Sequence, residues 1–381
     1  MQVLARRYDT SQPVLLTIQA GRVVRAEYPP LTAGERSVLP WVSPGWFDLQ
    51  VNGYGGREFS SGDLTADDVK RIAQAMGRLG ATRFLATVTT ENETVLGHAL
   101  ATITAACETD AATGRRIAGV HLEGPFISPE DGPRGAHPRA HCRLPNIGEF
   151  ERLQAVARGR IRLLTLAPEL PGALRLIEAA TEAGVAVAIG HTAAHAAEIH
   201  AAVEAGARLS THLGNGAHPM LPRHPNYIWH QLSDDRLWAS LIADGHHVPG
   251  EVLRCFVRAK SPSRCVLISD LSGQAGQPPG RYPGGLCEVE ILESGKLVIA
   301  GQSELLAGAT APLATGIARV MYDVQVPLAE AVDMASIRPA RLLGMKHGGF
   351  VPGDWADFTL FRIEASDEGR PPAIEVLGAA A

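Results

Sequence analysis

The sequence has no apolar stretch of the ~20 residues that a membrane-spanning helix requires. Its first ten residues contain arginines but no apolar segment of the kind found in secretory signals. Cysteine is scarce, with five in 381 residues, at positions 107, 142, 255, 265 and 287. The number is odd and no two form a Cys-x-x-Cys pair, so we expect reduced thiols rather than a disulfide framework. These absences predict a cytoplasmic protein with no membrane partner.

Positive charge is also not in excess. The chain has 35 Lys and Arg against 40 Asp and Glu, a formal net charge of -5. This balance argues against nucleic acid or an anionic membrane as the main partner. Hydrophobic residues make up 45% and charged residues 20%, which is typical of a globular enzyme. At this length the chain can form one large core with a small satellite domain, or two medium domains.

The two ends of the chain have strand-like patterns. Apolar and polar residues alternate over Val14–Ile18 and Gly21–Val24, with turn residues between them. A similar pattern returns over Gly353–Phe361. We therefore predict a small β-sandwich domain that is built from residues 1–43 and 347–381.

The middle of the chain repeats one theme, a short apolar run followed by a polar residue, a loop and an alanine-rich stretch with helical spacing. Eight such runs are present, at 42–48, 82–87, 117–122, 161–166, 185–189, 208–211, 238–242 and 266–269. Strands that alternate with helices predict a parallel sheet, and eight units of this length favour a closed barrel over an open sheet. The predicted fold is thus α/β, with a (β/α)8 TIM-like barrel as the catalytic domain over residues 44–346.

In such barrels the chemistry lies at the carboxyl ends of the strands. Glu123 ends the third run, His191 and His212 follow the fifth and sixth, and Asp270 follows the eighth. Taken singly, a histidine here could be structural, Glu123 could pair with an arginine, and Asp270 could cap a helix. Their shared position at one end of the barrel instead favours a site where they converge.

Two imidazoles and one carboxylate form a ligand set for Zn²⁺ or Fe²⁺ that leaves a position for water. Such a metal would lower the pKa of that water to near ~7. Asp270 could then accept the proton of the water and pass it to a leaving amine. No thiolate is available at these strand ends, so a structural zinc is not expected.

Several motifs in order resemble the amidohydrolase superfamily and, more narrowly, the N-acetylglucosamine-6-phosphate deacetylases. The resemblance covers nearly the whole chain. Its motifs are Pro44-Gly45-Trp46-Phe47-Asp48, Asn52-Gly53-Tyr54-Gly55-Gly56, His121-Leu122-Glu123-Gly124-Pro125-Phe126, Gly135-Ala136-His137, Leu166-Ala167-Pro168-Glu169, Gly190-His191-Thr192, Thr211-His212-Leu213 and Ile242-Ala243-Asp244-Gly245-His246-His247.

The resemblance implies roles for individual residues. One divalent metal ion per subunit would be held by Glu123, His191 and His212, with Asp270 as the acid/base residue. The residues implied in binding a small amino sugar phosphate are His137, Asn215, Gly216, Arg223 and His247. The family also implies a homodimer, in which Arg223 could reach into the pocket of the neighbouring subunit.

Some positions depart from the superfamily pattern. Many members have a His-x-His pair on the first strand and a carboxylated lysine, whereas this chain has Gln50 and Asn52 and no lysine at a strand end. Both departures favour one metal rather than two. The segments Gly214–Met220 and Leu271-Ser272 also differ from the usual deacetylase loops. The changes concern the substrate pocket, so the sequence supports metal-dependent hydrolysis more firmly than it supports a sugar phosphate.

The hypothesis is a hydrolase that converts N-acetylglucosamine 6-phosphate to glucosamine 6-phosphate and acetate. The alternative within the superfamily is a hydrolase of another N-acyl or cyclic amide substrate. Two histidines and a carboxylate also form the facial triad of non-haem iron oxygenases, which is a second class. A third is an inactive barrel that serves as a binding subunit.

Overall fold

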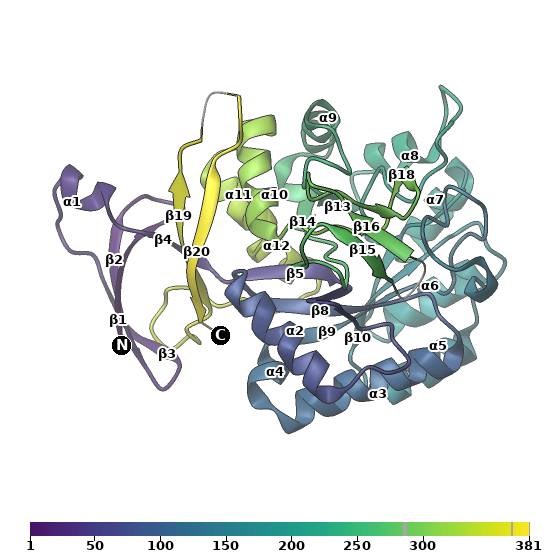
Figure 1. Cartoon of the computed structure of the whole chain (residues 1–381), viewed down its shortest axis with the longest axis horizontal. Coiled ribbons are helices and arrows are strands. Elements are labelled where there is room, and N and C mark those ends of the chain that lie inside the picture. The colour runs from purple at the N-terminus through teal and green to yellow at the C-terminus, as the bar shows by residue number, and fades with distance from the viewer. Residues whose placement is uncertain (285–287, 367–368, 381) are drawn as a thin grey trace.

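Eight parallel strands form the central sheet of the chain in the computed structural model (Figure 1), which describes residues 1–284, 288–366 and 369–380. The strands follow the sequence order around the sheet, each paired in parallel with the next. They are β5 (Trp46–Val51), β8 (Ala81–Thr89), β9 (Ile117–Glu123), β10 (Ile161–Leu166), β11 (Ala186–Ile189), β12 (Leu209–Ser210), β13 (Trp238–Ile242) and β14 (Cys265–Ile268).

The sheet closes between its first and last strands. The backbone N–H of Asp270 donates to the carbonyl of Gln50 at 3.0 Å, and the N–H of Asn52 donates to the carbonyl of Leu271 at 2.8 Å. Closure brings all eight carboxyl ends to one mouth, as the TIM barrel does. The predicted (β/α)8 barrel is confirmed.

Helices connect the strands and cover the outside of the barrel (Figure 1). They begin where the sequence supplies side-chain caps: Thr65, for example, accepts from the N–H of Asp68, whose carboxylate accepts in return from the N–H of Thr65. The helices are α2 (Ala66–Arg78), α3 (Glu93–Thr109), α4 (Ala111–Arg116), α5 (Ile147–Val156), α6 (Ala173–Glu182), α7 (Ala196–Glu204), α8 (Tyr227–Ser233), α9 (Gly250–Lys260), α10 (Leu313–Arg319), α11 (Leu328–Met334) and α12 (Ile337–Leu342).

The core has two parts that follow from the barrel geometry. Side chains that point into the barrel, including Phe47, Leu85 and Leu163, form an apolar plug. Side chains that point outward, such as Val120 and Leu164, pack against the helices. Strands buried on both faces read as continuous apolar runs, which is why the runs could be recognised in the sequence.

Strands from both chain ends form a separate six-stranded sheet beside the barrel (Figure 1). This confirms that the termini build a β-unit together, whereas its residue limits stay a prediction. The sheet has the order β20-β19-β4-β1-β2-β3, and its strands are β1 (Gln2–Arg7), β2 (Pro13–Gln19), β3 (Arg22–Glu27), β4 (Trp41–Pro44), β19 (Phe358–Glu364) and β20 (Ala373–Ala380). The short helix α1 (Ala33–Ser37) lies in the segment between β3 and β4.

The first predicted run, 42–48, is divided in the structure. Its beginning lies in β4 of the terminal sheet and its end lies in β5 of the barrel. Gly45 stands at the crossing, where a Cβ atom would lie 2.0 Å from the Thr82 hydroxyl and 2.2 Å from the Asp357 carboxylate. Only glycine fits so close an approach, so the glycine marks the change of sheet.

A four-stranded antiparallel sheet between β14 and α10 was not predicted. It consists of β15 (Gly280–Pro283), β16 (Glu288–Ile291), β17 (Leu297–Ile299) and β18 (Gln302–Leu306), and it has a small apolar cluster of its own around Val289 and Leu297. Two shorter strands, β6 (Gly53–Tyr54) and β7 (Arg57–Glu58), form a hairpin after β5.

Among the described residues, no helix is both long and apolar enough to cross a membrane. Cysteines 107, 142, 255 and 265 are free thiols, in agreement with the expectation of reduced cysteines. Cys287 lies outside the described residues.

Candidate metal centre and substrate pocket

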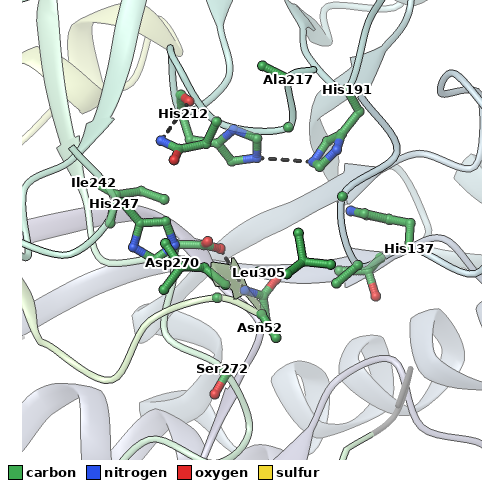
Figure 2. Close-up of a pocket in the computed structure, with 18 of the residues that line it drawn as sticks. Asn52, His137, His191, His212, Ala217, Ile242, His247, Asp270, Ser272 and Leu305 are labelled. Carbon is green, nitrogen blue, oxygen red and sulfur yellow. Dashed lines mark hydrogen bonds between the residues drawn. The ribbon is translucent and has the colours of Figure 1, made fainter. Parts of the chain in front are cut away.

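Three of the predicted side chains meet at the mouth of the barrel. The Oε1 atom of Glu123 lies 3.2 Å from Nε2 of His191 and 3.0 Å from Nε2 of His212, and the two Nε2 atoms are 3.1 Å apart. Figure 2 shows the two imidazoles facing each other across this short gap. All three residues are buried, and their three ligand atoms lie within 4.8 Å of one another. The cluster has the size and composition of a metal site.

The hydrogen bonds of His191 indicate that its Nε2 is free to bind a cation. Its Nδ1 lies 2.9 Å from the carbonyl of Pro133, which can only accept, so Nδ1 carries the proton. In the neutral ring Nε2 then presents a lone pair to the carboxylate of Glu123 and to His212. Two lone-pair atoms at this distance repel unless a proton or a metal cation lies between them. A carbonyl on the distal nitrogen is the usual partner of a metal-binding histidine. The donor set therefore fits a metal ion.

Strained backbone also occurs at this site. His191, His212 and Asp270 have φ angles of 51°, 29° and 53°, in the left-handed region that non-glycine residues rarely adopt. Each such residue costs of order 1–3 kcal/mol and persists only where the surrounding structure enforces it. All three lie two residues after a barrel strand, so one type of strained turn places each of these side chains at the mouth.

The amide side chains of Gln50, on β5, and of Asn52, just after β5, donate hydrogen bonds to the carboxylates of the site. Nε2 of Gln50 donates to Oε1 of Glu123 at 2.9 Å, and Nδ2 of Asn52 donates to Oδ1 of Asp270 at 2.8 Å. These positions correspond to the His-x-His pair that is common in the superfamily. In this chain they serve as hydrogen-bond donors to the acidic groups, a role that the sequence analysis did not assign.

Asp270 has an environment suited to proton transfer. Burial, together with the negative charge of Glu123, raises the pKa of its carboxyl to about 6, although Asn52 and the nearby His212 and His247 act in the opposite direction. A carboxyl with a pKa near neutrality can both accept and return a proton. Figure 2 shows Asp270 close to Asn52 on the side of the pocket where His247 also lies.

A buried carboxyl group beneath the mouth joins the strands that carry these residues. Oδ1 of Asp48 accepts from the N–H groups of Gln50 at 3.2 Å and Ser269 at 3.1 Å. Burial raises the pKa of Asp48 to about 7, against the effect of its hydrogen bonds. Asp48 thereby links the ends of β5 and β14, where the barrel closes and Asp270 follows.

A cavity of about 830 Å³ opens above the cluster. Its lining includes His137, Asn215, Gly216 and His247, four of the residues that the family resemblance implies in substrate binding. Figure 2 places His137 and His247 on opposite sides of this cavity. Strands β16 and β18 also border it through Val289, Gln302, Leu305 and Leu306, which the sequence analysis missed because this sheet was not predicted.

His247 is held by an acid from its own loop. Its Nδ1 lies 2.8 Å from Oδ2 of Asp244, whose other oxygen accepts from the backbone N–H groups of His246 and His247. Burial would raise the pKa of Asp244, but these hydrogen bonds and the charge of His247 lower it to about 2. Because the carboxylate accepts at Nδ1, Nε2 of His247 is left available for a ligand in the cavity.

Arg223 does not join the other predicted residues. Its side chain is exposed in the loop before α8 and does not line the cavity of its own subunit. No Arg or Lys is found among the described residues that line this cavity. The basic side chains in the described part of the lining are those of histidines.

The family follows from comparison with known proteins. The model of the amidohydrolase family matches residues 41–377, and the chain belongs to that family. It is therefore an enzyme of the class of metal-dependent hydrolases that act on carbon–nitrogen bonds, and the cluster of Glu123, His191 and His212 supports a metal cofactor.

Curated relatives are deacetylases. The chain is 35% identical over 356 residues, or 92% of each chain, to an N-acetylgalactosamine-6-phosphate deacetylase of Escherichia coli O157:H7. It is 34% identical over 330 residues to the N-acetylglucosamine-6-phosphate deacetylase of Bos taurus. This alignment covers 84% of this chain and 79% of the relative.

Solved structures agree in fold. An N-acetyl-D-glucosamine-6-phosphate deacetylase of Mycobacterium smegmatis, in complex with N-acetyl-D-glucosamine 6-phosphate as an aspartate-to-alanine variant, matches with a TM-score of 0.85. The match has 28% sequence identity and covers 100% of this chain and 98% of the other.

Proposed function

We propose that this enzyme deacetylates N-acetylglucosamine 6-phosphate, releasing acetate and glucosamine 6-phosphate. The observation that carries the proposal is the convergence of Glu123, His191 and His212 at one point of the cavity, with Asp270 after β14 lining the same cavity. Membership of the amidohydrolase family and the activities for which its relatives are named support this substrate class.

The proposed cofactor is one divalent ion per subunit, Zn²⁺ or Fe²⁺, held by Glu123, His191 and His212. Nitrogen and carboxylate ligands without thiolates suit both ions. Such an ion supplies Lewis-acid activation of a water molecule and of an amide carbonyl. Gln50 supports this arrangement because its amide donates to Glu123 and fixes the direction of the carboxylate.

Asp270 moves the proton in the proposed reaction. As a carboxylate it accepts a proton from the water that attacks the acetyl carbonyl. It then returns this proton to the nitrogen of the sugar as the carbon–nitrogen bond breaks, so that the amine leaves in neutral form. The Asn52 amide keeps Asp270 aimed into the cavity and favours its charged form.

The remaining residues orient the substrate. His137 lies against His191, with ring centroids 4.3 Å apart, and it is positioned to donate to the acetyl oxygen. His247 is oriented by Asp244 and would contact the sugar, together with the backbone at Asn215 and Gly216. A phosphate needs further positive charge, and the cavity lining of a single subunit contains no Arg or Lys among the described residues. We propose that Arg223 supplies it across the interface of a homodimer.

The test is an amine-release assay on purified enzyme with its metal content determined. The panel contains N-acetylglucosamine with and without the 6-phosphate, N-acyl amino acids and a dihydropyrimidine. Turnover of the phosphorylated sugar at least about tenfold above the other compounds supports the proposal. Preference for a cyclic amide or an N-acyl amino acid would replace it with the alternative hydrolase.

N-acetylgalactosamine 6-phosphate is a second candidate substrate. The reason is that the E. coli relative, which matches 92% of this chain, is named for that sugar. The two compounds differ only in the configuration of one hydroxyl group, so a direct comparison of kcat/KM for the two epimers decides between them.

We keep the prediction of a cytoplasmic location, which the free thiols of the described cysteines support. Fractionation of the source cells would test it.

A further inference from the structure

Two loops enclose the imidazole of His191. Residues 128–137 contribute the carbonyl of Pro133, which accepts from Nδ1 of the ring. They also contribute Gly135, where a Cβ would lie 3.3 Å from the ring. The second loop contributes Gly216, where a Cβ would lie 2.8 Å from the same Nδ1 atom. The imidazole of His191 is thus in close contact with both loops.

The same loops carry the proposed substrate contacts. His137 ends the first loop, and Asn215 and Gly216 lie on the second. A change in the separation of the loops would therefore move His137 relative to Asn215 and Gly216, which are the proposed substrate contacts.

His218 connects the two loops at the edge of the cavity. It belongs to the second loop, and its Nε2 lies 3.2 Å from Oε2 of Glu130 on the first loop. Its Nδ1 and its backbone N–H lie 3.0 Å and 2.7 Å from the hydroxyl of Tyr227, at the start of α8. At Gly132, on the first loop, a Cβ would lie only 2.9 Å from the Cα of His218, so the backbones are in direct contact.

The hydrogen bonds determine the tautomer of His218. The backbone N–H of His218 donates to the Tyr227 hydroxyl, so the hydroxyl proton is free to point at Nδ1 of His218. The proton of the neutral imidazole then lies on Nε2 and is donated to the carboxylate of Glu130. Tyr227 is buried while the side chain of Glu130 is 60% exposed. Nδ1 of His218 is therefore hydrogen-bonded to a buried side chain, and Nε2 is hydrogen-bonded to the loop of residues 128–137.

This arrangement lies in the segment Gly214–Met220, which departs from the usual deacetylase loop. We propose that His218 is a positioning residue that ties loop 128–137 to loop 213–220 and thereby sets the spacing of His137 and Asn215 around the substrate. The part concerning substrate depends on the proposed deacetylase function, whereas the connection between the loops does not.

The kinetic test compares His218→Ala, His218→Asn and Glu130→Ala with wild type. His218→Asn keeps a group opposite Tyr227 but is too short to reach Glu130. Each variant should raise the KM by about 3- to 5-fold, the range of a partly exposed charged contact, with kcat changed by less than about twofold. Glu130→Gln retains an acceptor for Nε2 and should restore a KM close to that of wild type.

The matched control is His200→Ala. His200 on α7 also faces a glutamate, Glu204, at 3.6 Å, but both side chains are well exposed and neither lines the cavity. This variant should have the kinetics of wild type. The double variant His218→Ala/Glu130→Ala should raise the KM no further than His218→Ala does, because both changes break one contact.

Hydrogen exchange provides a readout without substrate. Amides of residues 128–137 and 213–220 should exchange faster in His218→Ala and Glu130→Ala than in wild type or His200→Ala. Unchanged exchange in both loops, or additive effects in the double variant, would overturn the proposal. If wild type releases no amine from any N-acetylated sugar, the proposed function fails, and the exchange data still decide whether His218 connects the loops.

Discussion

Replacement of Asn52 by alanine should move the pH dependence of turnover. The Asn52 amide donates to the charged form of Asp270 at 2.8 Å in a buried site, and a hydrogen bond to a charged group is worth about 1.5–3 kcal/mol. Its loss disfavours the carboxylate and raises the pKa of Asp270. At 1.36 kcal/mol per pH unit, the acid limb of the kcat profile should move up by about 1 to 2 pH units.

The direction follows from the proposed reaction. Asp270 must be deprotonated to accept a proton from water, so activity falls as the pH drops through its pKa. The assay is amine release between pH 5 and 9 at saturating substrate, with metal content measured in parallel. Asn146→Ala is the control, since Asn146 caps α5, does not line the cavity and should leave the profile unchanged. An acid limb at the wild-type position in Asn52→Ala would refute this account of Asp270.

Three further predictions test other parts of the structure. Asp270→Asn should keep the metal content of wild type while lowering kcat by about 10²- to 10⁴-fold, as amine release and metal analysis would show. Gly216→Ala should weaken metal binding, measured by competition with a chelator, because its Cβ would lie 2.8 Å from Nδ1 of His191 at a φ of 56°. Arg83→Met should lower the free energy of unfolding by about 3–5 kcal/mol in denaturant titrations. The buried carboxylate of Asp357 lies 2.7 Å from the Arg83 guanidinium, and the substitution removes this charge partner. The activity per folded molecule of Arg83→Met should stay unchanged, since the pair joins the terminal sheet to the barrel away from the cavity; loss of turnover without loss of stability would contradict this.

The barrel could be predicted because its physics is local. Strands buried on both faces must be apolar throughout, and the glycines that end helices α6 and α7 must tolerate positive φ. Gly184 and Gly206 indeed have φ angles of 75° and 121°. The convergence of Glu123, His191 and His212 then followed from one rule, that parallel strands of a barrel present their carboxyl ends at one mouth.

The four-stranded sheet over the cavity could not be predicted in the same way. Its strands have three to five residues each, and over so short a length an alternating pattern is not distinctive. Its apolar cluster contains only a few side chains, around Val289 and Leu297. The wall that this sheet adds to the pocket therefore emerged only from the structure.

The positions of the amides and of Arg223 show two further limits of sequence reasoning. In the sequence, Gln50 and Asn52 are notable only because they stand in place of the His-x-His pair. An amide side chain does not by itself predict a carboxylate as its partner. Arg223 is implied by the family, yet in this chain it is exposed and does not line the cavity of its own subunit. The role proposed for Arg223 involves a second subunit, so the fold of one chain does not test it.

The central claim is that Glu123, His191 and His212 hold one catalytic divalent ion. The most direct test is the metal content of purified wild type and of Glu123→Gln, His191→Gln and His212→Gln, measured together with amine release from N-acetylglucosamine 6-phosphate. We expect about one Zn²⁺ or Fe²⁺ per wild-type subunit, and loss of both metal and turnover in each variant that remains folded. A folded variant that lacks the metal and yet keeps the wild-type rate would contradict it.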